Sequence, residues 1–311
     1  MTDLHAVVGA GGGIGGAIVR ALADAGRPVR ALARRSLDVP TGVEQRQVDL
    51  GDVDATAAAL AGAAVVYHCA MPSYHRWAQE FPTLTRAVAD AAARAGAGLV
   101  VADNLYTAPG DGRPITETDA PVPHGPKART RAAMRAELLA RGDLRVTFGR
   151  GADYYGAGPR GLNSVPGNTL FARAVAGRRM FWPGRLDQLH ALHYLPDLAR
   201  ALVLLADSAA PWGRTWNLPS PEPLTGRQYA AAASLARRPR VTPIPKLALR
   251  AAGLVDVQAR GVAEIFWQFD RPFLIDAAAF ETHIGRLPLT PHAEAVARTM
   301  TDLRSHPPAR R

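Results

Sequence analysis

Short apolar runs alternate with alanine-rich amphipathic stretches from residue 4 to about residue 150. Compact runs of β-branched and apolar residues bounded by turn residues predict strands, whereas apolar residues recurring every three or four positions predict helices. Six strands are predicted, over HAVVGA, PVRALA, VEQRQVDL, AVVYHCA, GLVVADN and LRVTFGR. Strands that alternate with helices are typical of a parallel sheet built from βαβ units, so we predict an α/β fold.

A glycine-rich turn joins the first predicted strand to a predicted helix in VVGAGGGIGGAIVRALADAG, residues 7–26. Its glycines fit a three-residue register at Gly9, Gly12 and Gly15, and a GxGxxG register at Gly11, Gly13 and Gly16. Glycines let the backbone turn tightly and approach a pyrophosphate, whose charge is met by the amides and positive dipole end of the helix. The flanking strand and helix favour dinucleotide binding over a merely flexible loop. The predicted contacts are Gly9, Gly12, Gly13, Ile14 and Gly15.

The end of the second predicted strand should decide between NAD and NADP. An acidic residue there would bind the ribose 2′-hydroxyl, but this chain has Arg34 and Arg35. A guanidinium can pair with a 2′-phosphate through two hydrogen bonds, so we predict NADP and rank NAD below it. Two surface arginines without a ligand are the alternative. Beyond the third strand, Asp49 can accept a hydrogen bond from the adenine amino group or serve only as a turn residue.

The second half of the chain differs in composition. From about residue 151 onward, glycine, proline and aromatic residues become denser, and longer loops separate the predicted helices. We predict a Rossmann-type domain with a doubly wound parallel sheet over residues 1–150. Residues 151–311 should form a smaller C-terminal substrate lobe, interleaved with late elements of the Rossmann domain. Within that lobe, Thr225 and Gln228 should form a capping box at the start of a helix.

Composition and charge narrow the class of protein. The chain has 311 residues, 48% of them hydrophobic, which is enough to bury a sizeable core. Its net charge of +10 comes from arginines scattered over predicted helix faces, not from a basic patch interleaved with aromatics. The single cysteine, Cys69, excludes an intramolecular disulfide and a CxxC metal site. Since no apolar run is long enough to span a bilayer, we expect a soluble cytoplasmic protein that binds no nucleic acid, membrane or metal.

Several motifs resemble the extended branch of the short-chain dehydrogenase/reductase family, the epimerase/dehydratase type. The matching segments are GAGGGIG, VDLGD, YHCAM, ITETDAPVP, LHYLPDLARALVLL, RTWNLPSPEPLTGRQYA and FETHIGRLPLTPHAEAVARTM. Their order and spacing extend the resemblance over nearly the whole chain. It implies that Leu50, Cys69, Ala70 and Met71 lie beside the cofactor, and it allows a homodimer.

Lys127, one of only two lysines, takes the place of the family's catalytic lysine. The resemblance implies that this lysine bonds the nicotinamide ribose and, together with the nicotinamide charge, lowers the pKa of a tyrosine that exchanges a proton. A compact ammonium that can be partly desolvated suits this role better than a guanidinium. In the family, the tyrosine stands four residues earlier, on the same face of one helix. Here that position is Pro123, so the usual proton carrier is missing.

Three replacements for the missing tyrosine are open. Tyr106 could swing under the nicotinamide and be tuned by Lys127, and we rank it first because it follows a strand at the carboxyl edge of the sheet. His124 could act as acid or base, since its ordinary pKa lies near neutrality. In the third alternative, no protein group carries the proton. Asn104 aligns with the family's Ser or Thr and can donate to a substrate carbonyl, but it cannot exchange a proton as a hydroxyl can.

Candidate substrate contacts follow the sixth predicted strand and continue into the second half. In the segment RGADYYGAGPRG, Asp153 precedes Tyr154 and Tyr155, which could form an aromatic wall or supply a phenol. Further candidates for the substrate mouth are Trp182, Arg185, His190 and His193. Packing inside the lobe is the alternative for the tyrosines, and simple surface exposure is the alternative for the arginine.

Two function classes follow from these features. The first is an NADP(H)-dependent oxidoreductase that moves hydride to or from a carbonyl or hydroxyl carbon of a small metabolite. Net reduction, epimerisation and dehydration use the same machinery, and the sequence does not separate them. The second is a non-redox protein that keeps the dinucleotide fold, either as a sensor of cofactor state or as a catalyst that uses the pocket alone. Loss of the tyrosine favours the second class, whereas Lys127 and the glycine turn favour the first.

Overall fold

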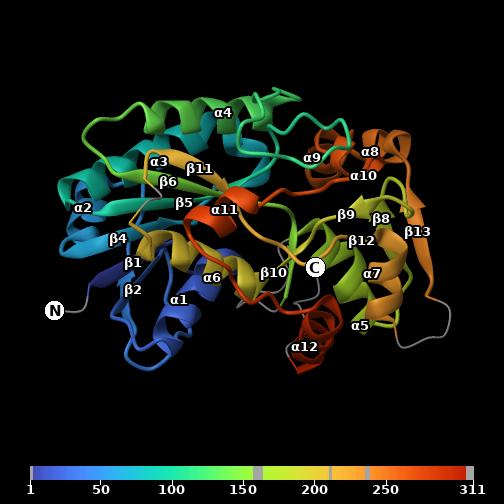
Figure 1. Cartoon of the computed structure of the whole chain (residues 1–311), viewed down its shortest axis with the longest axis horizontal. Coiled ribbons are helices and arrows are strands. Elements are labelled where there is room, and N and C mark those ends of the chain that lie inside the picture. Colours follow the sequence, from blue (N-terminus) through green and yellow to red (C-terminus); the bar gives the residue numbers. More distant parts are fainter. Residues whose placement is uncertain (1–2, 157–163, 210–211, 235–238, 306–311) are drawn as a thin grey trace.

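A seven-stranded sheet with the strand order β11-β6-β5-β4-β1-β2-β3 forms the centre of the computed structural model (Figure 1). The structure describes residues 3–156, 164–209, 212–234 and 239–305. The strands are β1 (Leu4–Val8), β2 (Val29–Ala33), β3 (Glu44–Gln47), β4 (Ala63–His68), β5 (Gly98–Asn104), β6 (Val146–Gly151) and β11 (Arg214–Asn217). All neighbouring strands run parallel. The six predicted strands and the α/β fold class are therefore confirmed, and the seventh strand comes from the second half of the chain.

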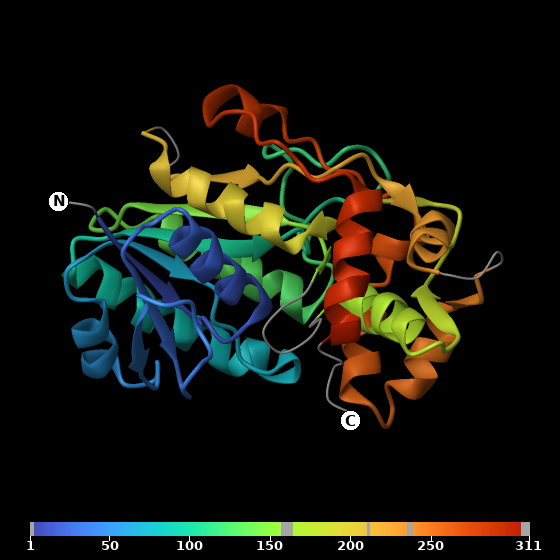
Figure 2. The same ribbon diagram turned by 90° about the horizontal axis from the view of Figure 1, so that it is seen from below.

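Helices cover both faces of this sheet because its strands carry apolar side chains on both faces. One face is covered by α1 (Gly13–Asp24) and α6 (Leu195–Asp207), which lie side by side in front of the sheet in Figure 2. The other face is covered by α2 (Val53–Leu60), α3 (Trp77–Arg94) and α4 (Pro126–Leu139). The short helix η1 (Tyr74–Arg76) leads into α3. Only β3, at the sheet edge, has mostly exposed side chains.

The second lobe is built from short strand pairs and helices, to the right of the sheet in Figure 1. Its strands are β7 (Tyr154–Tyr155), β8 (Met180–Pro183), β9 (Leu189–His190), β10 (His193–Tyr194), β12 (Leu224–Thr225) and β13 (Val241–Ile244). Its helices are η2 (Gly167–Phe171), α5 (Ala172–Val175), α7 (Gly226–Ala233), α8 (Lys246–Ala252), α9 (Val257–Glu264), α10 (Trp267–Asp270) and α12 (His292–Ser305), while α11 (Ala278–His283) packs beside β11. The predicted capping box between Thr225 and Gln228 is confirmed.

The connection between the two parts places the lobe over one edge of the sheet. The chain leaves β6 at Gly151 to enter the lobe and later returns through α6 and β11 to complete the sheet. In open α/β sheets, ligands bind outside the carboxyl ends of the strands. The segments that follow β1, β4, β5 and β6 meet at the carboxyl edge of the sheet, and the candidate site lies there. Within the described residues, every helix is too short or too polar to cross a lipid bilayer.

Candidate active site

The turn between β1 and α1 is shaped by two close backbone approaches. Gly9 has a φ of +83°, and a Cβ atom there would lie 2.5 Å from the backbone nitrogen of Ala70 at the end of β4. A Cβ at Gly15 would lie 2.4 Å from the carbonyl oxygen of Gly9. Both distances are too short for any side chain, so these glycines let the turn fold against β4 and against α1. The register of Gly9, Gly12 and Gly15 therefore carries the geometry of the turn.

The amino end of α1 offers free backbone donors at this turn. The amide of Gly16 bonds the carbonyl oxygen of Gly12 at 2.9 Å, and the amides of Gly13, Ile14 and Gly15 precede this first helical bond. Unpaired amides and the positive end of the helix dipole suit an anion such as a pyrophosphate. Because the backbone here is also free of bulky side chains, the turn fits a dinucleotide. The phenol of Tyr154 lies against it, 3.1 Å from the position that a Cβ of Gly13 would take.

The residues predicted around the adenosine half of the cofactor lie at the ends of neighbouring strands. Arg34 and Arg35 follow β2 and are exposed, and neither forms an ion pair with any described residue. Asp49 accepts a hydrogen bond from the Gly51 amide at 3.1 Å, as a turn aspartate does. Leu50, Cys69 and Ala70 are partly buried, whereas Met71 is 45% exposed.

Lys127 is buried in the first turn of α4 and is held by Glu264 at the end of α9. Its Nζ lies 2.5 Å from Oε2 of Glu264, and its backbone amide donates to Oε1 at 2.7 Å. The same ammonium lies 4.4 Å from the centre of the Tyr74 ring. One carboxylate therefore both caps the start of α4 and pairs with the lysine, while an aromatic face covers the cation.

Tyr106 contacts Tyr74, and the ring of Tyr74 in turn lies beside Lys127. The two phenolic oxygens are 2.8 Å apart, and the Tyr106 ring stacks on Trp77 with centroids 6.0 Å apart. Burial, followed by the charge of Asp153, raises the pKa of Tyr106. The direct pair that would let Lys127 tune Tyr106 is therefore not formed in this structure. Sequence reasoning missed Tyr74, because a tyrosine in the loop after β4 carries no local signal of catalysis.

Asn104 is placed at the end of β5 beside this pair. Its Oδ1 accepts a hydrogen bond from the Tyr106 amide at 3.1 Å. This bond fixes the turn after β5 and leaves Nδ2 without a protein partner among the described residues. The Nδ2 group therefore has donors available, and its contact with a substrate oxygen stays a prediction.

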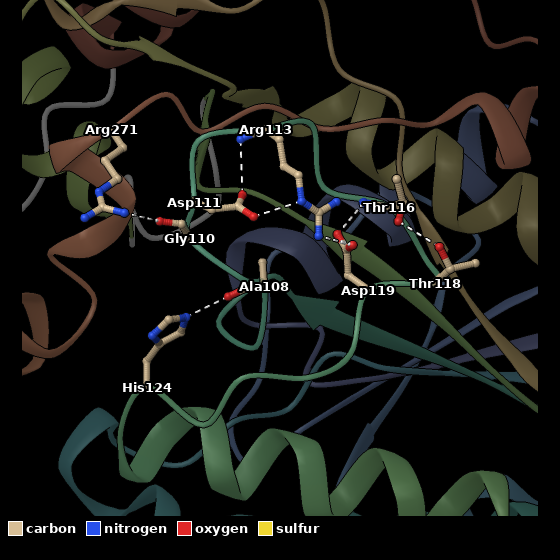
Figure 3. A network of polar contacts seen from close by, with 9 residues as sticks. All are labelled: Ala108, Gly110, Asp111, Arg113, Thr116, Thr118, Asp119, His124 and Arg271. Atoms are coloured by element: carbon tan, nitrogen blue, oxygen red, sulfur yellow. Dashed lines mark hydrogen bonds and ion pairs between the residues drawn. The ribbon is translucent and has the colours of Figure 1, made fainter.

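His124 is bound to the loop that follows β5 (Figure 3). Its Nε2 donates to the carbonyl oxygen of Ala108 at 2.7 Å, and its ring stacks on Trp267 with centroids 4.3 Å apart. In the same loop, Arg113 pairs with Asp111 at 2.8 Å and with Asp119 at 2.6 Å. These contacts give His124 a role in anchoring the loop to α10.

Asp153 follows β6 at this edge of the sheet and is partly buried. Its Oδ2 is buried and has no hydrogen-bond partner among the described residues, and burial raises the pKa of the carboxyl to about 7. Because β5 and β6 pair Asn104 with Gly151, Tyr106 and Asp153 each lie two residues beyond that pair. The sequence pattern assigned no role to Asp153, although the position of this residue directly after β6 was a usable signal.

Most residues predicted at the substrate mouth lie inside the lobe. Tyr155, Trp182 and His190 are almost completely buried, and His190 stacks on Phe269 with centroids 4.7 Å apart. Burial lowers the pKa of His190 to about 3. For Tyr155, packing inside the lobe therefore fits better than contact with a substrate. Trp182 and His190 were predicted at the substrate mouth, but their burial places them in the core of the lobe.

Two further predicted residues of the mouth have protein partners. His193 is buried, and its Nδ1 accepts a hydrogen bond from the Ala152 amide at 3.2 Å, so the ring helps to hold the turn before Asp153. Arg185 is exposed and pairs with Asp187 at 2.9 Å. Of the predicted substrate residues, Tyr154 alone is placed against the glycine turn.

Comparison with known proteins gives the same picture of the fold. The model of the NAD dependent epimerase/dehydratase family matches residues 5–218. No curated protein matches the chain. Among solved structures, MoeE5 in complex with UDP-glucuronic acid and NAD is 24% identical, with a TM-score of 0.76 over 97% of this chain and 99% of its own.

Two further structures are similar over comparable lengths. UDP-N-acetylglucosamine 4-epimerase from Bacillus cereus is 17% identical, with a TM-score of 0.78 over 97% of both chains. DesIV, a dTDP-glucose 4,6-dehydratase from Streptomyces venezuelae with NAD and TYD bound, is 18% identical, with a TM-score of 0.76 over 97% of both chains. At these identities the likeness describes the fold alone.

Proposed function

Because the chain belongs to the NAD-dependent epimerase/dehydratase family, we propose that it is an NADP(H)-dependent oxidoreductase that acts on a carbonyl or hydroxyl carbon of a small metabolite. The observation that carries this proposal is the joint position of the glycine turn and Lys127. Both lie at the carboxyl edge of the sheet, and Tyr154 and Tyr74 lie next to them. When bound, the nicotinamide would accept a hydride from that carbon or return one to it.

The preference for NADP rests on Arg34 and Arg35. Their guanidinium groups follow β2, are exposed, and have no carboxylate partner among the described residues. By contrast, Arg30 on the same strand is bound to Glu44 at 2.7 Å. Two unpaired cations at the place where the adenosine ribose would lie favour a 2′-phosphate over a free hydroxyl. NAD in the solved relatives is the reason to test both cofactors.

The substrate class is a carbonyl or alcohol, and nucleotide sugars are the first to test. Among the similar structures, MoeE5 is in complex with UDP-glucuronic acid, and the other two are a UDP-N-acetylglucosamine 4-epimerase and a dTDP-glucose 4,6-dehydratase. Net reduction, epimerisation and dehydration all begin with the same hydride exchange, so they remain three forms of one proposal.

A non-redox function is the second candidate, and a specific contact favours it. Lys127 is paired with Glu264 and lacks the tyrosine that such enzymes carry four residues earlier. A protein that only senses cofactor state would need the glycine turn but would not need a proton carrier. Both candidate functions require the protein to bind the dinucleotide, but only the oxidoreductase should convert a substrate.

The testing experiment is a titration of the purified protein with NADPH and NADH, followed by nicotinamide fluorescence. We expect NADPH to bind more tightly, and the double variant Arg34→Ala/Arg35→Ala to lose about tenfold or more of that preference. Arg250→Ala, an exposed arginine on α8, is the matched control and should change nothing. Equal affinities that the double variant leaves unaltered would remove the NADP assignment.

The same samples then receive aldehydes, ketones and nucleotide sugars. Oxidation of bound NADPH, or of NADH, by any of them would establish the oxidoreductase. Binding without turnover across all three classes would favour the sensor. Failure to bind either dinucleotide would overturn both candidates.

A further inference from the structure

We propose that Asp153 is the group that carries the substrate proton in place of the missing tyrosine, a role that rests on the proposed function. The ionised carboxylate would accept the hydroxyl proton at Oδ2 when the alcohol carbon gives its hydride to the nicotinamide, and the neutral carboxyl would return the proton in the reverse direction. The proton and the hydride together make up the two-electron change, so no further reactant is needed.

The position of Asp153 in the fold is the first support. The residue follows β6 directly, and β6 pairs with β5 so that Asn104 stands opposite Gly151. Tyr106, the residue ranked first by sequence, stands two residues beyond the same pair on β5. Asp153 and Tyr106 therefore follow adjacent strands at the carboxyl edge of the sheet. Each lies two residues beyond the pair formed by Asn104 and Gly151.

The neighbours of Asp153 place it between the two halves of the candidate site. Tyr154, the next residue, lies against the glycine turn at Gly13. On the other side, the charge of Asp153 acts on the phenols of Tyr74 and Tyr106, whose rings lead to Lys127. A group between the pyrophosphate turn and the lysine is where a proton carrier for the nicotinamide end would have to lie.

The state of the carboxyl is the second support. Asp153 is partly buried, and its enclosed Oδ2 has neither a hydrogen bond nor an ion pair with any described residue, whereas the buried carboxylates of the described residues have cationic partners. Asp103 is paired with Arg131 and Arg135, and Asp197 with Arg200 and Thr290. A carboxyl oxygen enclosed without a partner is costly to keep for structure alone, so its retention at this edge indicates a chemical use. Its raised pKa would let it exchange a proton near neutral pH.

The tyrosines beside Asp153 are poorer proton carriers. Burial raises the pKa of Tyr106 and of Tyr74, and the cation near Tyr74 faces its ring instead of its oxygen. His124 is bound to a loop carbonyl and stacked on Trp267. Among the groups considered for the task, Asp153 alone combines placement at the edge with an uncommitted proton-exchanging atom.

The test follows the Asp153 carboxyl by ¹³C NMR of aspartate-labelled protein, and assigns its signal by loss in Asp153→Asn. We expect a midpoint near pH 7 in the ligand-free protein. Because oxidised nicotinamide is cationic, NADP⁺ should lower that midpoint by about 1 unit, whereas 2′,5′-ADP, which lacks the ring, should leave it in place. NAD⁺ and ADP are used in the same way if NAD is the cofactor that binds.

The outcomes separate this proposal from the proposed function. A carboxyl that titrates in the ordinary aspartate range, or a midpoint that a bound dinucleotide does not move, would overturn the role of Asp153 and leave the dinucleotide proposal standing. No binding of NADP⁺ or NAD⁺ by the wild type would overturn the proposed function, and this role with it. Asp143→Asn, an exposed aspartate bound to Arg141, is the control and should leave the titrating signal unaltered.

Once a substrate is found, a second measurement applies. Asp153→Asn should bind the dinucleotide within about threefold of wild type but turn over about 100-fold or more slowly, because general acid–base catalysis is worth about 10²–10⁴. A variant that keeps wild-type turnover would contradict the proposal.

Discussion

The glycine turn and the Lys127 cluster lie at the same edge of the sheet, but the chain specifies them by different means. The close approaches at Gly9 and Gly15 involve backbone alone, either of the turn itself or of Cys69 and Ala70 after β4. Lys127, in contrast, is positioned by Glu264, which is 137 residues away in the sequence. The comparison teaches that the glycine spacing of the turn can be recognised within one short segment, although the turn also packs against β4, whereas the partner of Lys127 is set by tertiary packing alone.

The largest expected effect comes from breaking the turn. Gly9→Ala would combine a positive φ with a Cβ only 2.5 Å from the Ala70 nitrogen, so strain and overpacking together should cost about 4 kcal/mol of unfolding free energy. Any folded fraction should bind dinucleotide at least about 100-fold more weakly, because the turn can no longer lie against β4. Chemical denaturation and a nicotinamide fluorescence titration measure both effects.

Gly26→Ala is the matched control for this change. Gly26 also has a positive φ, +67°, but a Cβ there would meet nothing within 4 Å. The strain alone should cost about 1 kcal/mol and leave dinucleotide binding intact. Equal losses in the two variants would show that conformation, and not the close approach to β4, accounts for the glycine at position 9.

The next effect is a pH dependence of stability at Asp153. Its pKa is raised to about 7 in the folded protein and should be near 4 when unfolded. The stability that the neutral carboxyl contributes is therefore full below about pH 4 and is lost as the pH rises toward 7. The loss should be on the order of 3 kcal/mol.

Asp153→Asn removes this titration and isolates its contribution. The free energy of unfolding of the variant, minus that of wild type, should rise between pH 4 and pH 7 and then level off. Asp187→Asn is the contrast, because pairing with Arg185 lowers the pKa of that exposed carboxyl to about 2. Its substitution should produce no change near pH 7, and a flat difference for Asp153→Asn would refute the raised pKa.

A smaller effect is expected from the lysine. Lys127→Ala should weaken dinucleotide binding about tenfold, because it removes the buried ammonium that the proposed function assigns to the ribose hydroxyls. The chain offers a matched control in its other lysine, because Lys246 is exposed on α8 and Lys246→Ala should bind as wild type does. Unaltered affinity in Lys127→Ala would mean that the lysine serves only to hold Glu264 and α9.

The same contrast explains what the sequence could predict. Six strands of the sheet, the glycine turn and the capping box at Thr225 depend on short-range patterns and were predicted from them, whereas β11 and the short strands of the lobe were not. Arg34 and Arg35 were placed correctly at the end of β2 for the same reason. Tyr74 and Glu264 were missed, because nothing near either residue signals that Lys127 will lie between them.

Burial was the second quantity that the sequence did not supply. Trp182 and His190 stand in a segment rich in aromatic and charged residues, which suggested a substrate mouth. In the fold, the pairing of β8 with β13 and of β9 with β12 encloses them. For Asp153 the burial was underestimated instead. A single aspartate before two tyrosines does not indicate that one of its carboxyl oxygens is enclosed without a hydrogen-bond partner.

The smallest effect tests whether the two tyrosines act as one unit in the Lys127 cluster. Tyr74→Phe and Tyr106→Phe each remove one end of the same 2.8 Å hydrogen bond and leave the other phenol buried without it. Each should lower the free energy of unfolding by about 1 kcal/mol, and the double variant should lose no more than either single one, because the bond can be lost only once. Chemical denaturation of the three variants gives the coupling energy directly. Strict additivity would mean that the phenols find separate partners, and the connection from Tyr106 to Lys127 through Tyr74 would then have to be abandoned.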